Sequence, residues 1–307
     1  MVHVPDLACQ EDIQVGNMRL FYYKAEKGNF GDDLNELLWG RLLGDLLRRN
    51  DSAVFVGIGS IFDTRLDLIK ERKIIFGTGI ASQRRLPTID SSYDIRFLRG
   101  PISARAVGED DKWISDSALA VRLISWPEVE PIRDVGFMPH FLSLPFLNWP
   151  KVCKDIGLHL ISPQLPAEQT IAELRSCKRI ITEAMHGAIV CDAFRVPWLR
   201  VTINSWQRED FDISCLKWLD WGLSVRADVT PVHLEPLLGW GRRMLLDPAR
   251  LIDRISAQRK LVKMLQNLPR TEGFRLSNET LLREATDRLR CEMDRLKSES
   301  GEMQGTC

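Results

Sequence analysis

The amino-acid sequence predicts an α/β protein of two Rossmann-like halves, each built on a parallel sheet, followed by C-terminal helices. Short apolar runs alternate with segments of helical periodicity, which is the pattern of βα units. The apolar runs are continuous, as strands covered by helices on both faces require. From Pro231 onward the pattern is helical. The expected domains are residues 1–130 and 131–235, with a helical segment, 236–307, that packs on or bridges them.

The first half is expected to contain four strands and at least two helices. The apolar runs predicted to be strands are Met18–Tyr23, Ala53–Ile61, Ile74–Ile80 and Ile95–Leu98. Leucines recur at helical spacing from Leu34 to Leu47, so a helix is expected after the first strand. A second helix is expected from Pro101 toward Val107, because proline suits the first turn of a helix.

The second half repeats the α/β pattern. Trp126–Pro150 is rich in prolines and poor in periodic elements, so it is interpreted as the crossover between the halves. The strands expected beyond it are Ile156–Ser162, Arg179–Thr182 and Trp198–Ile203, with a helix over Gly187–Phe194. Two nucleotide-binding-like halves with a ligand cleft between them fit a GT-B-like arrangement.

The C-terminal segment carries one clear helix start and one heptad-like pattern. Asp247-Pro248 combines an N-cap residue with proline at the first helical position. Between Ser277 and Lys297, three leucines recur seven residues apart. This spacing fits an amphipathic helix packed on its own domain, or a self-association helix that forms a homo-oligomer.

Composition limits the class of protein. Lys+Arg and Asp+Glu both number 42, so net charge gives no sign of a nucleic-acid or anionic-membrane partner. No apolar run reaches the length of a membrane span, and Met1–Gln14 lacks the regions of a signal peptide. The seven cysteines form no CxxC pair, which argues against a zinc site and a disulfide framework. We therefore expect a cytoplasmic protein without a metal or a nucleic-acid partner.

Glycine-containing turns follow three of the first-half strands. Glycine lets the backbone approach a ligand closely, and free amides at a helix start favour anions. Asp32 follows a strand end and could accept a proton from a substrate hydroxyl; alternatively, it only caps the helix. No turn matches GxGxxG, so a dinucleotide fingerprint is not supported. The candidate ligand-binding residues of these turns are Gly28, Asn29, Gly31, Gly57, Gly59, Ser60, Gly77 and Gly79.

Arg99 stands at the end of the fourth predicted strand, directly before Gly100-Pro101, and Arg105 lies six residues further on. A guanidinium at such a position can clamp a phosphate or carboxylate through its planar fork. The alternative for each arginine is a solvated surface group.

The segment Ile180–Ile189 is the most informative candidate site. A β-rich run ends in a polar pair that includes Glu183, and His186-Gly187 then opens a helix of small residues, with Met185 and Gly187 as candidate ligand-binding residues. This geometry is expected to expose the histidine at the cleft, where a group that titrates near neutrality suits proton transfer. The alternative is a hydrogen-bonded histidine of the core.

At these residues the sequence resembles the polysaccharide pyruvyl transferase family, particularly the ketal-forming enzymes of rhizobial and xanthan-type exopolysaccharide synthesis. Four blocks carry the resemblance: Gly28–Asp33, Val56–Ser60 with Phe76–Ile80, Phe97–Arg105 with Ser115–Ala118, and Thr182–Pro197. They span most of residues 18–203, and the block around His186 is the most specific. The resemblance implies a GT-B-like fold, phosphoenolpyruvate as donor, and no obligatory metal or nucleotide.

The resemblance also implies residue roles. His186 matches the family's catalytic histidine before glycine, and Arg99 looks like the arginine that holds the donor. A eukaryotic branch has arginine two places before the histidine, where this chain has Ala184. The second donor contact is then missing, or comes from another arginine. The candidates for it are Arg105, Arg179 and Arg195.

Together these points predict a ketal-forming site in which His186 is the acid, Glu183 or Asp32 is the base, and Arg99 clamps the donor. The acceptor implied by the resemblance is a lipid-linked oligosaccharide at the inner face of the cell membrane, which would bring the protein to that face as a peripheral partner. Four tryptophans could stack sugars or could form core. They are Trp198, Trp206, Trp218 and Trp221.

Two other functions remain open from the sequence. One is a GT-B glycosyltransferase with a nucleotide-sugar donor, because a strand, loop and helix of this kind surrounds the diphosphate in such enzymes. The other is a non-catalytic scaffold of an exopolysaccharide complex, for which the heptad-like segment 277–297 is the main support.

Overall fold

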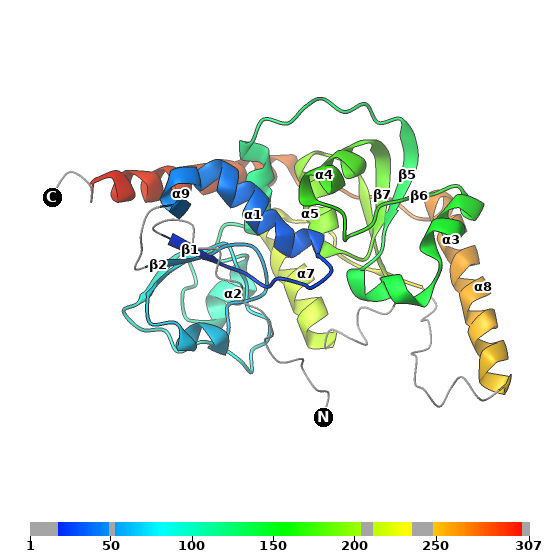
Figure 1. Cartoon of the computed structure of the whole chain (residues 1–307), viewed down its shortest axis with the longest axis horizontal. Helices are drawn as coiled ribbons and strands as arrows, with labels where there is room; N and C mark the ends of the chain where they lie inside the picture. The colour runs from blue at the N-terminus through cyan, green and yellow to red at the C-terminus, as the bar shows by residue number, and fades with distance from the viewer. Residues whose placement is uncertain (1–17, 49–52, 204–210, 235–247, 303–307) are drawn as a thin grey trace.

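The structure of the protein is a computed structural model, which describes residues 18–48, 53–203, 211–234 and 248–302 (Figure 1). Two parallel sheets lie side by side, each with helices packed against it. The last helix runs back from the second half and lies along the first (Figure 1). The predicted α/β class, with two parallel sheets and C-terminal helices, is confirmed; the GT-B-like arrangement is compatible with it.

The first sheet has the strand order β1-β2-β3-β4, and all pairs are parallel. Its strands are β1 (Met18–Phe21), β2 (Ala53–Val56), β3 (Arg72–Phe76) and β4 (Tyr93–Phe97). β2 and β3 are shorter than the predicted apolar runs because their glycine-rich ends leave the sheet: φ is +132° at Gly59 and +86° at Gly77.

Helices and 3₁₀ turns connect and cover these strands. They are α1 (Phe30–Leu43), η1 (Gly44–Arg48), η2 (Thr64–Leu68), α2 (Pro101–Ala106) and η3 (Ser117–Leu123). The leucine periodicity after the first strand correctly predicted α1, and Pro101 begins α2 as expected.

The second sheet has the strand order β6-β5-β7-β8-β9, again with parallel pairs throughout. Its strands are β5 (Arg133–Met138), β6 (His159–Leu160), β7 (Cys177–Thr182), β8 (Trp198–Thr202) and β9 (Val232–His233). The chain runs outward from β5 to β6 and then returns to the other side of β5. This order is that of a doubly wound sheet.

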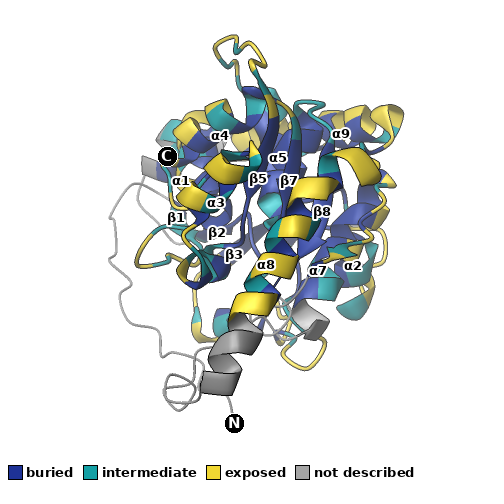
Figure 2. Ribbon diagram, turned by 90° about the vertical axis from the view of Figure 1, so that its right-hand side faces the viewer, coloured by how far each residue is buried: buried dark blue, intermediate teal, exposed yellow. Residues whose placement is uncertain are grey.

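The helical elements of this half are η4 (Phe141–Phe146), α3 (Trp149–Ile156), α4 (Ala167–Arg175), α5 (Met185–Ala193) and α7 (Phe211–Val225). β5 and β7 are buried in the interior (Figure 2). The helix α7 leaves its own half and packs on α2, so the two halves share this helix.

The interpretation of Trp126–Pro150 as a crossover poor in elements holds for the link before Arg133 and is wrong beyond it, because the rest contains the inner strand β5 and η4. Gly136 weakened the strand signal, since glycine is uncommon inside strands. The structure needs glycine there: a Cβ at Gly136 would lie 2.6 Å from Cδ1 of Ile180 on the neighbouring strand.

Two long helices end the described chain, α8 (Pro248–Thr271) and α9 (Glu279–Glu302). Pro248 begins α8 as predicted, while its expected cap, Asp247, lies outside the described residues. The three heptad leucines are buried in the same core cluster as η3, each at most 2% exposed. In this structure the apolar stripe therefore packs on its own chain. In the described part of the chain, no helix is both long and apolar enough to cross a bilayer.

Candidate functional site

The predicted histidine segment lies where the strand order of the second sheet reverses, between β5 and β7. Met138 pairs with Thr182 in the parallel register, so both strands end at the same edge. Glu183 and His186 directly follow β7 there. In doubly wound sheets, ligands bind outside the carboxyl ends of the strands at this reversal. The fold thus places His186 where a ligand-contacting side chain is expected.

His186 lies in the first turn of α5, which begins at Met185, two residues before the predicted start. Its ring packs against the first turn of α1: a Cβ added at Gly31 would lie 2.0 Å from Nδ1 of His186. There is also no space for a side chain at Gly187, because an added Cβ would lie 2.8 Å from Sδ of Met138. These two glycines allow α5 to approach α1 and the end of β5.

Asp116 faces the other ring nitrogen of this histidine. Its Oδ2 lies 3.8 Å from Nε2 of His186, and its Oδ1 accepts a hydrogen bond from the amide of Ala118 at 2.9 Å. Within the described residues, Oδ2 of Asp116, Oγ of Ser117 and Nε2 of His186 are buried without a hydrogen-bond partner. Buried polar atoms are nearly always paired, so these unpaired atoms make the surroundings of His186 a candidate functional site.

Asp32 lies in the first turn of α1, close to the same histidine. Burial raises the pKa of its carboxyl from 3.8 to about 6, against the opposing effects of His186 and of the Asn29 amide. A Cβ on Gly59 would lie 3.8 Å from Oδ1 of Asp32, so the carboxyl borders the turn after β2. Lys217 on α7 also lowers this pKa through its charge. A carboxyl with this pKa can exchange a proton near neutrality.

Asp33, the neighbour of Asp32, has the capping role that the sequence left open. Its Oδ2 accepts a hydrogen bond from the amide of Asn29 at 3.0 Å. Gly28 precedes this cap with φ +79°, a value that favours glycine. The two adjacent aspartates thus have different surroundings: Asp33 holds the start of α1, and Asp32 borders His186.

The turn after β2 is held from α1 by Asn35, a residue that sequence reasoning missed. The Asn35 side chain donates to the carbonyl of Ile58 at 3.0 Å and accepts from its amide at 2.9 Å. Gly57 allows α1 to lie close to this turn, because a Cβ added at Gly57 would lie 2.3 Å from Nε1 of Trp39. The available signal was a polar residue on the same helix face as the apolar residues Leu38 and Trp39.

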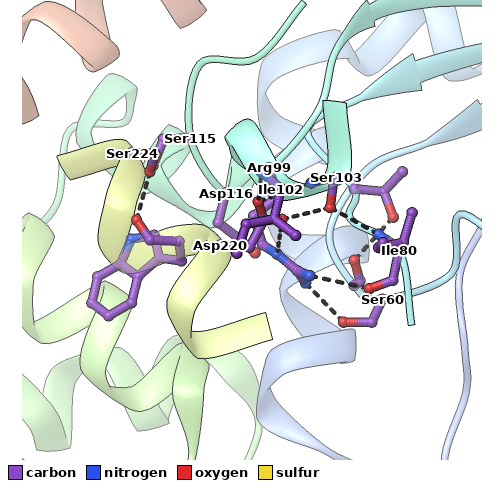
Figure 3. A network of polar contacts seen from close by, with 12 residues as sticks. Ser60, Ile80, Arg99, Ile102, Ser103, Ser115, Asp116, Asp220 and Ser224 are labelled. Atoms are coloured by element: carbon purple, nitrogen blue, oxygen red, sulfur yellow. Dashed lines mark hydrogen bonds and ion pairs between the residues drawn. The ribbon is translucent and has the colours of Figure 1, made fainter. Parts of the chain in front are cut away.

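Arg99 lies in a closed polar network, seen in Figure 3. Its Nε is 3.1 Å from Oδ2 of Asp220, Nη1 donates to Oγ of Ser60 at 2.7 Å, and Nη2 donates to the carbonyl of Ile80 at 3.2 Å. The side chains of Arg99 and Asp220 are fully buried. The guanidinium therefore orients Ser60 and anchors α7, and its fork is directed at protein atoms.

Asp220 completes this network by capping α2. It accepts hydrogen bonds from the amides of Ile102 and Ser103 at 2.9 and 3.1 Å, and from the Ser103 hydroxyl. Two glycines allow Arg99 and Asp220 to lie this close to the backbone of the first half. A Cβ at Gly79 would lie 2.3 Å from Cζ of Arg99, and one at Gly100 would lie 2.1 Å from the carbonyl oxygen of Asp220.

Gly77 likewise allows a close approach of Ser117, because a Cβ added at Gly77 would lie 2.4 Å from Cβ of Ser117. Several of the glycines predicted to admit a ligand therefore admit protein side chains. They are Gly31, Gly57, Gly77 and Gly79.

Glu183 has both carboxylate oxygens occupied by backbone amides. Oε1 accepts from Ile203 at 2.7 Å and Oε2 accepts from His140 at 3.0 Å. The buried carboxylate thus ties the ends of β5, β7 and β8 together. Of the two carboxylates expected to act as base, Asp32 has the environment that suits proton exchange.

The three other candidate arginines lie away from the start of α5. Arg105 is exposed in the last turn of α2. Arg179 lies near the beginning of β7, at the opposite edge from His186, and pairs with Asp134 at 3.0 Å. Arg195 follows the C-terminal end of α5 and binds Ser277. The cation that borders Asp32 is instead Lys217, which sequence reasoning missed.

Three of the four candidate tryptophans are core residues. Trp198, Trp218 and Trp221 pack on one another with ring centroids 5.5 to 6.1 Å apart, and each is at most 1% exposed. Trp206 lies outside the described residues.

The buried cysteines are not suited to nucleophilic chemistry. Burial raises the pKa of the Cys153 thiol to about 12 and that of Cys177 to about 11. Both thiols therefore stay protonated near neutrality. Among the described residues, no three His, Cys, Asp or Glu side chains gather as a metal-ligand set.

Comparison with known proteins identifies the family. Residues 5–205 match the polysaccharide pyruvyl transferase family. The chain is 33% identical over 220 residues to the succinoglycan biosynthesis protein ExoV of Rhizobium meliloti (strain 1021), a match covering 70% of this chain and 67% of that protein. No solved structure matches the chain. The chain belongs to the polysaccharide pyruvyl transferase family, as the resemblance predicted.

Proposed function

We propose that this member of the family transfers the pyruvyl group of phosphoenolpyruvate to two hydroxyls of one sugar in an exopolysaccharide precursor. The products are a cyclic ketal and inorganic phosphate. Family membership supports pyruvyl transfer to a polysaccharide, and the similarity to a succinoglycan biosynthesis protein supports an exopolysaccharide acceptor. The observation that carries the proposal is the position of His186 at the strand-order reversal, beside a carboxyl with a pKa of about 6.

The reaction needs two proton transfers that balance. A proton adds to C3 of the donor, which becomes a methyl group and leaves C2 electron-poor. Two sugar hydroxyls form C–O bonds to C2, the bond from C2 to the phosphate oxygen breaks, and the hydroxyls release two protons. One released proton replaces the proton delivered to C3, and the other leaves with phosphate. A general acid and a general base therefore suffice.

His186 is the acid in this scheme, and Asp32 is the base. Nδ1 of His186 faces the first turn of α1, the turn that carries Asp32, so both groups border the same region. The interaction between their charges, which lowers the pKa of Asp32, supports this proximity. Glu183 keeps the strand ends in place and is not assigned a proton-transfer step.

Lys217 is proposed to bind the anionic donor, together with the turn of Gly59 and Ser60. Lys217 precedes Asp220 by three positions on α7, so both side chains lie on the helix face that meets the first half. Its charge acts on Asp32, which borders that turn. Arg99 contributes indirectly, because it holds the Ser60 hydroxyl.

The acceptor and the location are proposed from the family alone. A lipid-linked oligosaccharide at the inner face of the cell membrane would supply the sugar, and the protein would act there from the cytoplasm without crossing the membrane. The scheme uses no cofactor, because protonation of the donor alkene itself activates C2.

The test is transfer by the purified protein, with phosphoenolpyruvate and the oligosaccharide acceptor, followed by phosphate release and the acceptor's mass spectrum. His186→Ala is expected to lower kcat by about 10³-fold, the usual effect of losing a general acid. The control is His159→Ala, which removes a histidine paired with Glu173 at the edge of the second sheet. Near-normal turnover of His186→Ala would contradict the proposal. Release of nucleoside diphosphate from a nucleotide sugar would replace it with glycosyl transfer.

A further inference from the structure

We infer that Asp116 is the positioning residue of His186: it holds the Nε2–H side of the imidazole and directs Nδ1 toward the reacting donor. The inference rests on the proposed function in one respect, namely that His186 is the acid. Asp116 itself lies behind the ring and has no contact with substrate in this scheme.

The first argument is the fixed orientation of the Asp116 carboxylate. Its Oδ1 is the side-chain cap of η3 and is held by the Ala118 amide. A capped carboxylate cannot rotate freely, so Oδ2 stays directed at Nε2 of His186, 3.8 Å away. Both atoms are buried, and neither has another hydrogen-bond partner among the described residues.

The second argument comes from the other buried carboxylates. Glu183 binds two amides, Asp220 binds two amides and Arg99, and Asp192 binds the amide and hydroxyl of Ser277. In Asp116, by contrast, the fully buried oxygen Oδ2 has no such bond among the described residues. Leaving an acceptor unpaired in the interior costs about 1–3 kcal/mol. A cost of this size is expected at Oδ2 of Asp116 if this oxygen acts on the imidazole of His186.

The third argument is what lies on the two sides of the ring. Nε2 is buried beside Asp116, whereas Nδ1 faces the first turn of α1 and the region of Asp32, and the His186 side chain keeps 15% of its surface exposed. The proton that leaves the ring must therefore leave from Nδ1. A carboxylate opposite Nε2 keeps a proton there and so selects the tautomer that can regain its proton at Nδ1.

The separation of 3.8 Å is that of an ion pair and exceeds the length of a hydrogen bond. Contacts between catalytic groups are often long in substrate-free enzymes and tighten in the complex. The two residues belong to different halves, Asp116 to the first and His186 to the second.

The primary test is the imidazole ¹⁵N spectrum of His186 in the free protein, assigned by its loss in His186→Gln. In the wild type at alkaline pH, where the ring is neutral, the proton is expected on Nε2. In Asp116→Asn the amide can donate to Nε2, so the proton is expected on Nδ1 in a substantial fraction of molecules. A wild-type spectrum with the proton on Nδ1 overturns the inference without the use of any variant.

Kinetics supply the second test. Asp116→Asn is expected to lower kcat about 10²-fold, with KM for phosphoenolpyruvate within about three-fold of the wild type, as for loss of a residue that orients a functional group. A matched control is Asp192→Asn, on the same helix as His186 but six positions further along. This change is expected to lower the Tm and to leave the His186 ring signals unchanged.

The outcomes separate this inference from the proposed function. If Asp116→Asn leaves both the ring signals and kcat unchanged, the inference is wrong and the transferase proposal stands. If the wild type transfers no pyruvyl group but the ring signals shift in Asp116→Asn, the proposed function fails and the positioning contact stands.

Discussion

Two buried contacts between acidic and basic side chains join the halves of this protein, and they differ in how fully they are satisfied. In the Arg99–Asp220 contact, the atoms are 3.1 Å apart, and both residues make further hydrogen bonds to the protein (Figure 3). In the His186–Asp116 contact, the atoms are 3.8 Å apart and lack hydrogen-bond partners. The first pair anchors the halves with both side chains fully buried, whereas the second, with the His186 side chain 15% exposed, is the candidate reactive pair.

The largest expected effect is on the anchor. Asp220→Ala should lower the free energy of unfolding by about 3–5 kcal/mol, because it leaves the guanidinium of Arg99 buried without its carboxylate. Urea denaturation measures this change. The control is Asp228→Ala, which removes an exposed partner of Arg275 and should change the free energy by at most about 1 kcal/mol. Equal effects of the two substitutions would show that the network does not anchor the halves.

Asp32→Asn should raise stability while it removes activity. The pKa of Asp32 is about 6 in the folded protein, against 3.8 as its ordinary value, so the folded state binds this proton more tightly than the unfolded chain does. Its favourable contribution is present below pH 3.8 and is lost as the pH rises through 6. At pH 7 the ionised group thus costs up to about 3 kcal/mol, which asparagine avoids.

Urea denaturation of the wild type and Asp32→Asn at pH 4 and pH 7 measures this difference. The variant should be more stable at pH 7 and nearly equal to the wild type at pH 4, and pyruvyl transfer should be lost. A variant that is less stable at pH 7 would mean that the Asp32 carboxylate is a structural ligand, as Glu183 is.

Gly31→Ala should impair the site without removing any functional group. The new Cβ would lie 2.0 Å from Nδ1 of His186, so the ring must move, and a displacement of about 1 Å can lower a rate about 10²-fold. Gly40→Ala is the matched control in the same helix, where an added Cβ meets nothing within 4 Å. It should stabilise the protein by about 0.5–1 kcal/mol with unchanged kcat. Full activity of Gly31→Ala would place the reactive ring nitrogen elsewhere.

The smallest effect is expected at an exposed contact between α9 and β4. Arg96 pairs there with Glu299, whose side chain is about half exposed. Glu299→Gln should lower the free energy of unfolding by no more than about 1 kcal/mol, because exposed ion pairs contribute little. Thermal unfolding measures the change. A larger loss would mean that charge, more than the buried leucine stripe, holds α9 in place.

The sequence predicted the elements that depend on local pattern. The leucine spacing of α1, the proline at the start of α2 and the apolar run of β7 are all signals within a few residues, and the structure contains each element. β5 was missed because Gly136 interrupts its strand character, and only the contact with Ile180 on the next strand explains that glycine.

The residues of the site were found by type, but their partners were not. Asp220 is 121 positions from Arg99, and nothing local to either residue indicates that the two meet. Asp116 belongs to the block Ser115–Ala118 of the family resemblance, yet its relation to His186 depends on how the halves dock. Glu183 looked like a base until its two backbone partners were known. Long-range pairing, more than residue chemistry, limited prediction of the site.

The sharing of the helix α7 between the halves also has a consequence for the timing of synthesis. Asp32, Asp116 and His186 are all translated before α7, since they precede residue 211. Asp220, which fastens this helix to the first half, and Lys217, the proposed donor cation, are translated only afterwards. If the proposed assignments hold, a nascent chain that already carries the proposed acid and base lacks its proposed donor cation until α7 is translated and docks on the first half.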